Sequence, residues 1–328
     1  MRHEWKPELD QRSLLPLQPS PARATRHRSV FLQMLSLGAR ISLKRSAVFC
    51  LRFACRPVST FGWISFLDDF SRRQAIGRPH DDLLRKSLDV FFITGIPSPA
   101  RLGLMTEHFR IAAELLRHDD LAALWRGERL DMGTVSGRHE DYDMQMLLAD
   151  HCGCRHEGVF AIKLSRASDD YTLWTASVVF VRGEDGSPSL AIGGMQGPKG
   201  ADAKRAIISA TRCLGGLRPK DAMLLALHGL VSSANPAHIL AVSNAAHVIN
   251  QRRRKRRRLM QADLDGYWTE RGGKPVEPFG FQMPAPSAPQ IDSPNRREQS
   301  KRAFWDIGAG FCRLSNLRAL AKASLNKA

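Results

Sequence analysis

The sequence predicts a mixed α/β fold, an antiparallel meander followed by helix, strand, helix and strand, with extra helices at the N-terminal side. Three observations support this prediction. Apolar residues recur at helical spacing over 99–117, they alternate with period two between 157 and 192, and helical spacing returns over 201–214. The composition agrees, because 43% of the 328 residues are hydrophobic and 25% are charged, as in globular proteins.

Two helices are expected before the meander. The first starts at Ser98-Pro99, a suitable cap and first-turn pair, and its apolar face consists of Leu102, Met105, Phe109, Ala112 and Leu116. A shorter helix is expected through Ala122 and Leu124.

The meander is expected to have three strands, over 157–164, 171–182 and 190–192. The polar segment 167–170 supplies the first turn, and Asp185-Gly186 supplies the second, since this dipeptide accepts the positive φ of a tight hairpin.

Helical and strand patterns alternate in the second half. We expect helices over 201–214 and from Pro219, a short buried strand over 238–243, a helix over 262–271 and a last strand near 279–283. The stretch Ala222–Gln251 has no charged residue, but its continuous apolar part is only about ten residues, short of the roughly 20 that span a bilayer. No transmembrane segment is therefore expected.

The charge is distributed unevenly. The chain carries a net charge of +17, of which residues 1–60 hold +8, Arg252–Arg258 holds +7 and residues 291–328 hold +5, so the remainder is at −3. This distribution predicts a basic, poorly ordered extension over 1–60, a single α/β domain over 61–290 and a basic tail over 291–328. The Pro-rich segment after Pro284 is expected to be a loosely packed linker.

The basic segments indicate acidic partners. Seven consecutive cations in Arg252–Arg258 suit an anionic membrane surface or nucleic acid. No aromatic residue is interleaved for base stacking, so nucleic acid is the weaker alternative. Residues 1–60 resemble an organellar transit peptide in composition, but we favour a disordered bacterial extension. Six cysteines are ordinary for a reducing compartment, so we expect a cytoplasmic protein, peripheral at the inner membrane.

One short segment is rich in metal-ligating residue types. His151, Cys152, Cys154 and His156 lie within six residues. The Cys-x-Cys spacing differs from the Cys-x₂₋₄-Cys of structural zinc sites, and no second pair follows at the expected distance. We therefore predict no metal site here.

Several function classes are disfavoured by missing motifs. The sequence contains no Walker A loop, no Gly-x-Ser-x-Gly elbow, no His-Glu-x-x-His and no Cys-x-x-Cys. Common ATPases, α/β-hydrolases, zincins and thioredoxin-like enzymes are accordingly not expected.

An ordered series of motifs resembles the bacterial VirK/YbjX family over about residues 85–305. The motifs are Ala100-Arg101-Leu102, Glu107-His108-Phe109, Arg155–Gly158, Gly193–Gly197, Gly215–Lys220, Val242–His247, Tyr267–Gly273 and the basic Ser300–Ala303. The resemblance implies roles in Gram-negative envelope remodelling, tolerance of antimicrobial peptides and virulence. The family has no settled biochemical activity.

The expected element order also resembles the acyl-CoA N-acyltransferase (GNAT) topology. The loop of that fold reads Gln/Arg-x-x-Gly-x-Gly/Ala, whereas here Gln196 is followed directly by Gly197-Pro198-Lys199-Gly200. A Gly-rich turn that opens a helix suits a phosphate or pyrophosphate, so acyl-CoA is the hypothesised cofactor. The hypothesised cofactor-binding residues are Gly194, Gln196, Gly197, Lys199, Gly200, Ser243 and Asn244, and His247 and Tyr267 are the hypothesised acid or base.

Two functions from different classes remain open. One is an acyl-CoA-dependent enzyme that acts on an envelope precursor or a protein. The alternative is a non-catalytic envelope-stress factor that binds a protein partner, an anionic membrane or nucleic acid. Thermal stabilisation by acyl-CoA distinguishes them, because a specific ligand stabilises the folded state by mass action.

Overall fold

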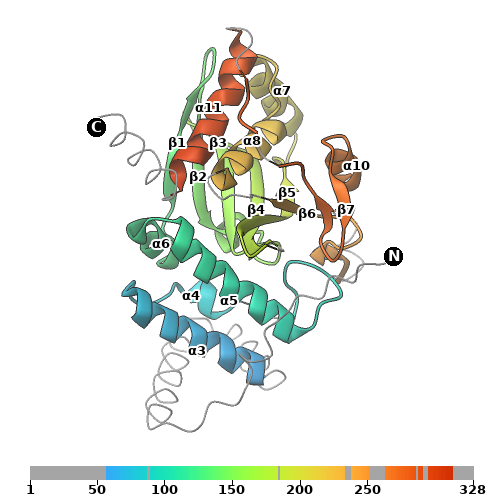
Figure 1. Cartoon of the computed structure of the whole chain (residues 1–328). Helices are drawn as coiled ribbons and strands as arrows, with labels where there is room; N and C mark the ends of the chain where they lie inside the picture. Colours follow the sequence, from blue (N-terminus) through green and yellow to red (C-terminus); the bar gives the residue numbers. More distant parts are fainter. Residues whose placement is uncertain are drawn as a thin grey trace, which may run out of the picture.

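A central β-sheet organises the molecule (Figure 1). The computed structural model describes residues 57–86, 89–183, 185–232, 238–251, 263–285, 287–290 and 295–312. Its strands are β1 (Leu130–Ser136), β2 (Asp141–Leu148), β3 (Phe160–Arg166), β4 (Thr172–Arg182), β5 (Pro188–Gln196), β6 (Ile239–Val242), β7 (Lys274–Val276) and β8 (Gly280–Gln282). Its helices are α3 (Pro57–Gln74), α4 (Asp81–Leu84), α5 (Ser98–Leu115), α6 (His118–Trp125), α7 (Ala203–Cys213), α8 (Pro219–Val231), α10 (Leu264–Thr269) and α11 (Arg296–Phe311), with 3₁₀ turns η2 (Ala149–Cys152) and η3 (Val248–Gln251).

The sheet has the order β1-β2-β3-β4-β5-β6-β8-β7. Strands β1 to β5 form an antiparallel meander, β6 runs parallel to β5, and β8 and β7 continue antiparallel. The mixed α/β class is thus confirmed, and the strand expected near 238–243 is present as β6.

The meander is longer than the three strands predicted, because β1 and β2 precede it. Strand β2 buries Tyr142, Met144 and Met146, while the intervening Asp143 and Gln145 are only partly buried. This period-two alternation is the usual pattern of a strand with one buried face, and it was overlooked in the sequence.

Helix α5 lies beneath one end of the sheet (Figure 1). Strand β4 extends past the first residue of β3, because Phe160 pairs with Val178 and β4 continues to Arg182. The Phe180 N–H in this extension donates to Nδ1 of the buried His108 on α5, at 2.9 Å. The Glu107-His108-Phe109 motif therefore connects α5 to the sheet.

Helices α8 and α11 cross the sheet together (Figure 1). They approach closely at two glycines, since a Cβ on Gly229 would collide with the Trp305 carbonyl and one on Gly308 with the Ala226 carbonyl. Phe304 is fully buried in this layer. Residues 296–311, expected as part of a basic tail, form this packed helix, in which apolar residues at helical spacing lie among the charged ones.

The N-terminal helix α3 packs through aromatic rings. Trp63, Phe66 and Phe70 contact Phe109 on α5, with ring centroids 5.8–6.4 Å apart. The basic run at 252–258 and nearly all of the extension at 1–60 lie outside the described residues. The division of the chain into extension, domain and tail stays a prediction. Among the helices that the structure describes, none has the length and apolarity to cross a membrane.

Candidate functional site

The site centres on Glu157, which sequence reasoning did not select as a functional residue. Glu157 is the last residue of a turn. Its N–H closes this turn by donating to the Cys154 carbonyl, at 2.8 Å. The same turn is held from the other side, where the Phe92 N–H donates to the His156 carbonyl at 2.7 Å. These bonds fix the direction in which the Glu157 side chain leaves the backbone.

The Glu157 carboxylate faces the end of β5. Both of its oxygens accept from Gln196 Nε2, at 2.9 Å each. A Cβ on Gly193 would collide with the Glu157 carbonyl, and a Cβ on Gly194 would collide with the Glu157 carboxylate. The two glycines therefore make room for Glu157, and the missing side chains are what allow a carboxyl to lie against a buried strand.

Burial raises the pKa of Glu157 to about 7, although the Gln196 amide and the charge of Lys199 oppose this shift. The carboxyl therefore changes protonation near neutral pH. A group of this kind is suited to accept and return a proton, because a general base works best when its pKa is close to the operating pH.

His247 lies beside the same glycine. A Cβ built on Gly194 would lie 3.3 Å from His247 Nε2, so the imidazole and the Glu157 carboxylate border one position. His247 Nδ1 accepts from the Ile249 N–H at 3.2 Å, which leaves the proton of the neutral ring on Nε2. Burial lowers the pKa of His247 to about 4, so at pH 7 it is a neutral donor.

The predicted Gly-rich turn is shorter than expected. Residues Gly193–Gln196 belong to β5, where Gly194 pairs with Ser177 and the register shifts by a bulge. The turn itself covers 197–202, with Gly200 at φ +102°, and leads into α7. Asp202, the residue before α7, makes no side-chain cap, so the first N–H groups of the helix are not bonded by it.

Ser243 and Asn244 take structural roles in the turn after β6. Ser243 Oγ accepts from the Ala246 N–H at 3.1 Å. Asn244 Oδ1 accepts from the Leu264 N–H at 3.2 Å, and its own N–H donates to Asp265 Oδ1 at 2.7 Å. These bonds order the segment that holds His247. Their assignment to a ligand stays a prediction.

Tyr267 belongs to a separate, cationic cluster. Its ring lies between Lys220 Nζ, 3.4 Å from the centroid, and the Arg271 guanidinium, 3.6 Å away. Its hydroxyl donates to Asp221 Oδ1 at 3.1 Å, and Asp221 also accepts from Arg271. Burial raises the pKa of Tyr267, and burial together with Arg271 lowers the pKa of Lys220 to about 8.

The Glu157 site and the Tyr267 cluster approach each other near Gln196 and Gly197. Gln196 reaches Glu157, whereas a Cβ on Gly197 would lie 2.7 Å from the Trp174 ring, and Lys220 Nζ is 6.0 Å from that ring. The Glu157 carboxyl therefore contacts the last residue of β5, while Gly197 and the Lys220 side chain are both close to the Trp174 ring. Trp174 Nε1 is buried with no hydrogen-bond partner among the described residues.

The hypothesised residues therefore divide in two. Gly194, Gln196 and His247 come together with Glu157, while Tyr267 is held elsewhere. Arg155–Gly158 leads into a predicted strand and a glycine pair lies at the end of another, but neither pattern indicates an enclosed carboxyl. What the sequence did not show is that these segments, separated along the chain, face each other.

The fold and site define a mixed α/β protein with a titratable carboxyl at the end of a central strand. The chain belongs to the family described as "Protein of unknown function (DUF535)", whose model matches residues 39–305. It is 23% identical over 261 residues to the "Uncharacterized protein YbjX" of Escherichia coli (strain K12), which covers 77% of this chain and 78% of that protein. These findings confirm the resemblance to VirK/YbjX proteins. No solved structure matches the chain.

Proposed function

We propose that this protein is an acyl-CoA-dependent acyltransferase in which Glu157 is the general base. The observation that carries the proposal is the Glu157 carboxyl, whose pKa is about 7, facing Gly194 and His247 at the end of β5. A general base removes a proton from a reacting group. The amine or hydroxyl that accepts an acyl group carries such a proton.

The sheet supports a ligand of the acyl-CoA class. Strands β5 and β6 are paired only from Leu190–Ile192 to Ile239–Ala241, while β5 continues to Gln196. An extended segment beyond its paired register presents N–H and C=O groups along one edge. Pantetheine carries two amides on an extended chain. These amides suit hydrogen bonds with the backbone groups of such an edge, as an added strand would make.

The phosphates of such a ligand need cations or free N–H groups. The turn 197–202 leads into α7, an eleven-residue helix whose N-terminus attracts anions. Lys199 lies in this turn. Lys220 Nζ is 6.0 Å from the centroid of the Trp174 ring, which a Cβ on Gly197 would touch, and Arg271 lies against Tyr267 beside Lys220. These cations support the cofactor expected from the sequence.

The reaction then balances without another co-reactant. The nucleophile of the acceptor attacks the thioester carbonyl and gives its proton to Glu157. The C–S bond would break, the acyl group would pass to the acceptor, and Glu157 would return the proton to the CoA sulfur, which restores the carboxylate. His247 Nε2–H is placed beside this carboxylate and orients or stabilises the developing oxyanion. Tyr267, whose hydroxyl donates to Asp221, has a positioning role in the cationic cluster.

The acceptor that we propose is an envelope precursor or an envelope-associated protein. The roles implied by the resemblance to VirK/YbjX proteins support this choice. The net charge of +17 favours anionic surfaces, which is consistent with a cytoplasmic protein that works at the inner face of the membrane.

The test combines binding and turnover. Full-length protein is titrated with acetyl-CoA and with a long-chain acyl-CoA, and release of free CoA thiol is followed with a thiol reagent. We expect stabilisation of the wild type by at least one of these ligands. Glu157→Gln should bind acyl-CoA within about twofold of the wild type but release CoA roughly a hundredfold more slowly. The rate of the variant should also no longer rise with pH through about 7.

Two outcomes would contradict the proposal. If neither acyl-CoA binds the wild type at millimolar concentration, the acyltransferase function is wrong, and the non-catalytic alternative is left. If Glu157→Gln turns over as fast as the wild type, the ligand class survives but Glu157 is not the base.

A further inference from the structure

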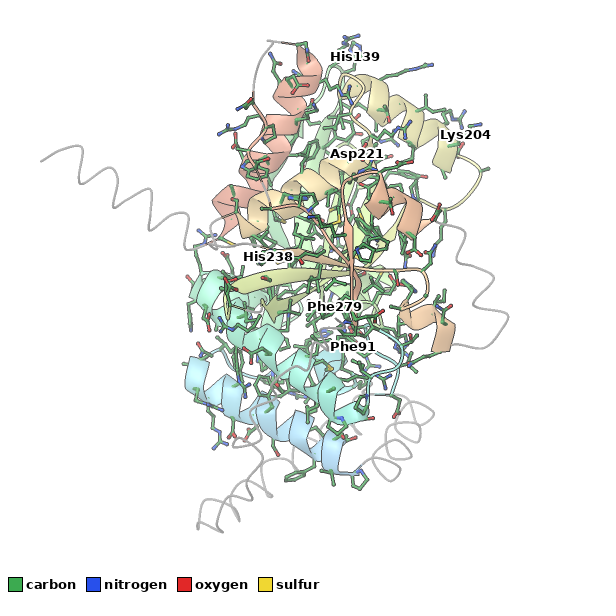
Figure 2. The ribbon with its side chains drawn as sticks, turned by 45° about the vertical axis from the view of Figure 1, so that its right-hand side comes forward. Phe91, His139, Lys204, Asp221, His238 and Phe279 are labelled. Carbon is green, nitrogen blue, oxygen red and sulfur yellow. The ribbon has the colours of Figure 1, made fainter. Side chains whose placement is uncertain are left out.

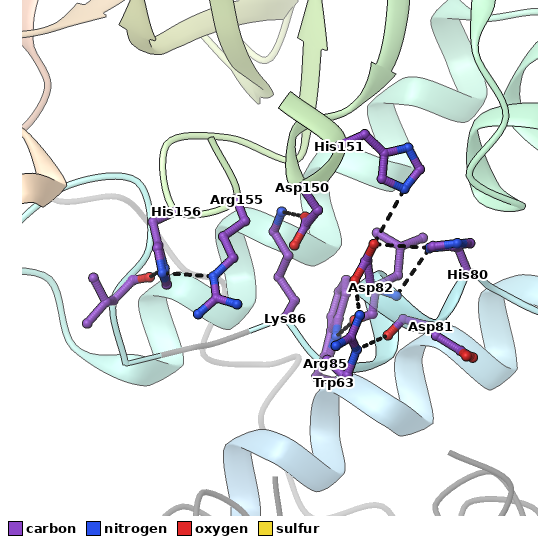
Figure 3. Close-up of polar contacts among 12 residues, drawn as sticks. Trp63, His80, Asp81, Asp82, Arg85, Lys86, Asp150, His151, Arg155 and His156 are labelled. Carbon is purple, nitrogen blue, oxygen red and sulfur yellow. Dashed lines mark hydrogen bonds and ion pairs between the residues drawn. The ribbon is translucent and has the colours of Figure 1, made fainter. Parts of the chain in front are cut away.

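A second group of titratable side chains lies apart from Glu157, between α4 and η2. His80 and Asp82 lie at the start of α4, and His151 lies in η2 (Figure 3). One ligand atom from each of the three lies within 4.8 Å of the others. The two imidazole rings are nearly perpendicular, with centroids 5.1 Å apart.

The distances within this triad are informative. Asp82 Oδ2 is 3.5 Å from His80 Nδ1 and 3.4 Å from His151 Nε2. Both distances exceed those of a good charge-assisted hydrogen bond, about 2.7–2.9 Å. They match the edge of a tetrahedron around Zn²⁺, about 3.4 Å when the metal–ligand bonds are about 2.0–2.1 Å long.

The carboxylate is oriented from outside the triad. Asp82 Oδ1 accepts from Arg85, so the second oxygen, Oδ2, is the one that faces both imidazoles (Figure 3). Outer partners of this kind fix the direction of a ligating carboxylate in metal sites. His80 is held by its backbone N–H, which donates to the Trp125 carbonyl at 2.8 Å, and its ring lies against Gly127.

The two segments that carry the ligands are also joined independently of them. Lys86, just after α4, forms an ion pair with Asp150 in η2 at 2.7 Å, and its side chain is 1% exposed. This pair sets the separation of α4 and η2 before any ion binds. The triad itself remains accessible, because the side chains of His80, Asp82 and His151 are 34%, 21% and 26% exposed.

We propose that His80, Asp82 and His151 form a binding site for a divalent transition metal of the Zn²⁺ class, with its fourth position open to solvent. Two imidazoles and one carboxylate are a ligand set that Zn²⁺ and Co²⁺ accept. The ion ties α4 to η2 and so fastens the N-terminal helices to the sheet. His80 Nδ1 accepts from the Asp82 N–H at 3.2 Å, and this bond is exchanged for the metal bond on binding.

This site revises the interpretation of the His151–His156 segment. His151 takes part, but with ligands from residues 80 and 82 rather than with its neighbours in sequence. Cys154 is buried and its thiol donates to the Cys152 carbonyl, while His156 Nδ1 bonds the Val90 carbonyl at 2.7 Å. The ligand set was hidden because its members come from two distant segments.

The test is a Co²⁺ titration of the full-length, reduced, metal-free protein, followed by Zn²⁺ displacement. We expect one equivalent of Co²⁺ with the visible absorption of a four-coordinate ion, its loss on adding Zn²⁺, and a thermal shift with Zn²⁺ that disappears when a chelator is added. Asp82→Asn should weaken Co²⁺ binding at least about tenfold.

His151→Ala is the cleanest variant, because this side chain is partly exposed and does not cap a helix. It should abolish the Co²⁺ absorption while the thermal stability in chelator matches that of the wild type. His139→Ala is the matched control, since His139 is exposed and lies near the top of the view in Figure 2, far from Phe91, whose ring faces Lys86 Nζ. Binding by His151→Ala within about twofold of the wild type, or no Co²⁺ absorption in the wild type, would overturn the proposal.

Discussion

Buried glycines at two places in this protein have different neighbours. Gly229 and Gly308 let α8 and α11 approach until backbone meets backbone. At the end of β5, Gly194 meets the end of a carboxylate side chain and the edge of an imidazole instead. The comparison teaches that a buried glycine marks a candidate site when it meets the ends of titratable side chains, as Gly194 does, and marks close packing when it lies between the backbones of two helices.

The largest effect is expected at the helix crossing. Gly308→Ala places a methyl group against the Ala226 carbonyl, which cannot move without shifting α8. We expect the free energy of unfolding to fall by about 3 kcal/mol. Gly310→Ala on the same helix is the control, because nothing lies within 4 Å of its Cβ position, and it should stabilise by up to about 1 kcal/mol. Urea unfolding of both variants measures the difference, and equal stabilities would show that the close approach of α8 and α11 does not matter.

A smaller effect, with a particular pH dependence, is expected for Glu157→Gln. The folded-state pKa of Glu157 is raised from 4.5 to about 7, so the folded protein binds more protons than the unfolded chain between these values. Stability from this group is complete below about pH 4.5 and is lost as the pH rises through 7. Because Gln carries no charge, the variant should gain about 2.5 kcal/mol of stability relative to the wild type between pH 5 and pH 8.

Two buried histidines make the stability change with pH in the opposite direction, in the wild type and in Glu157→Gln alike. Burial lowers the pKa values of His228 and His247 to about 4, so their contribution is lost as the pH falls from 6.5 toward 4. Chemical unfolding at several pH values therefore compares wild type and Glu157→Gln on the same histidine background. A stability difference that does not change between pH 5 and pH 8 would contradict the raised pKa of Glu157.

The smallest change in stability is expected for Gly194→Ala. Its methyl group meets only the ends of the Glu157 and His247 side chains, which can turn aside, so the loss should be below about 1 kcal/mol. The carboxylate must leave its place beside β5, however, and acyl-CoA binding should weaken at least about tenfold. Gly193→Ala is the contrasting variant, because there the methyl group meets the Glu157 carbonyl. If both variants lose the same stability, the distinction between side-chain and backbone neighbours fails.

Much of the fold was predictable because its patterns are local. The period-two run that became β4, the glycines that end α7 and the proline that starts α8 each act within a few residues. Strands β1 and β2 were missed although β2 alternates, since acidic residues in a half-exposed strand weaken the apolar signal. Helix α11 was missed because its segment is basic, and burial of Phe304 against α8 outweighs that composition.

The site was only half predictable. Gly194, Gln196 and His247 were selected from the sequence as a glycine-rich turn and a histidine, and they do lie together. Glu157 was not, because a carboxylate beside a strand gives no sign in the sequence that it will be enclosed. Its pKa is raised by burial and partly lowered by the contact with Gln196, and both depend on how the segments pack in the folded chain.

The sequence by itself determined the class of the fold, the strand over 238–243, the glycine pair at 193–194 and the family. Tertiary structure alone decided that Glu157 meets Gln196, that Tyr267 lies between two cations, and that His80 and Asp82 meet His151. The physical reason is the separation along the chain over which each effect acts. Backbone propensity and apolar periodicity act between near neighbours, whereas pKa values and ligand sets arise where distant segments exclude water from the same few polar atoms.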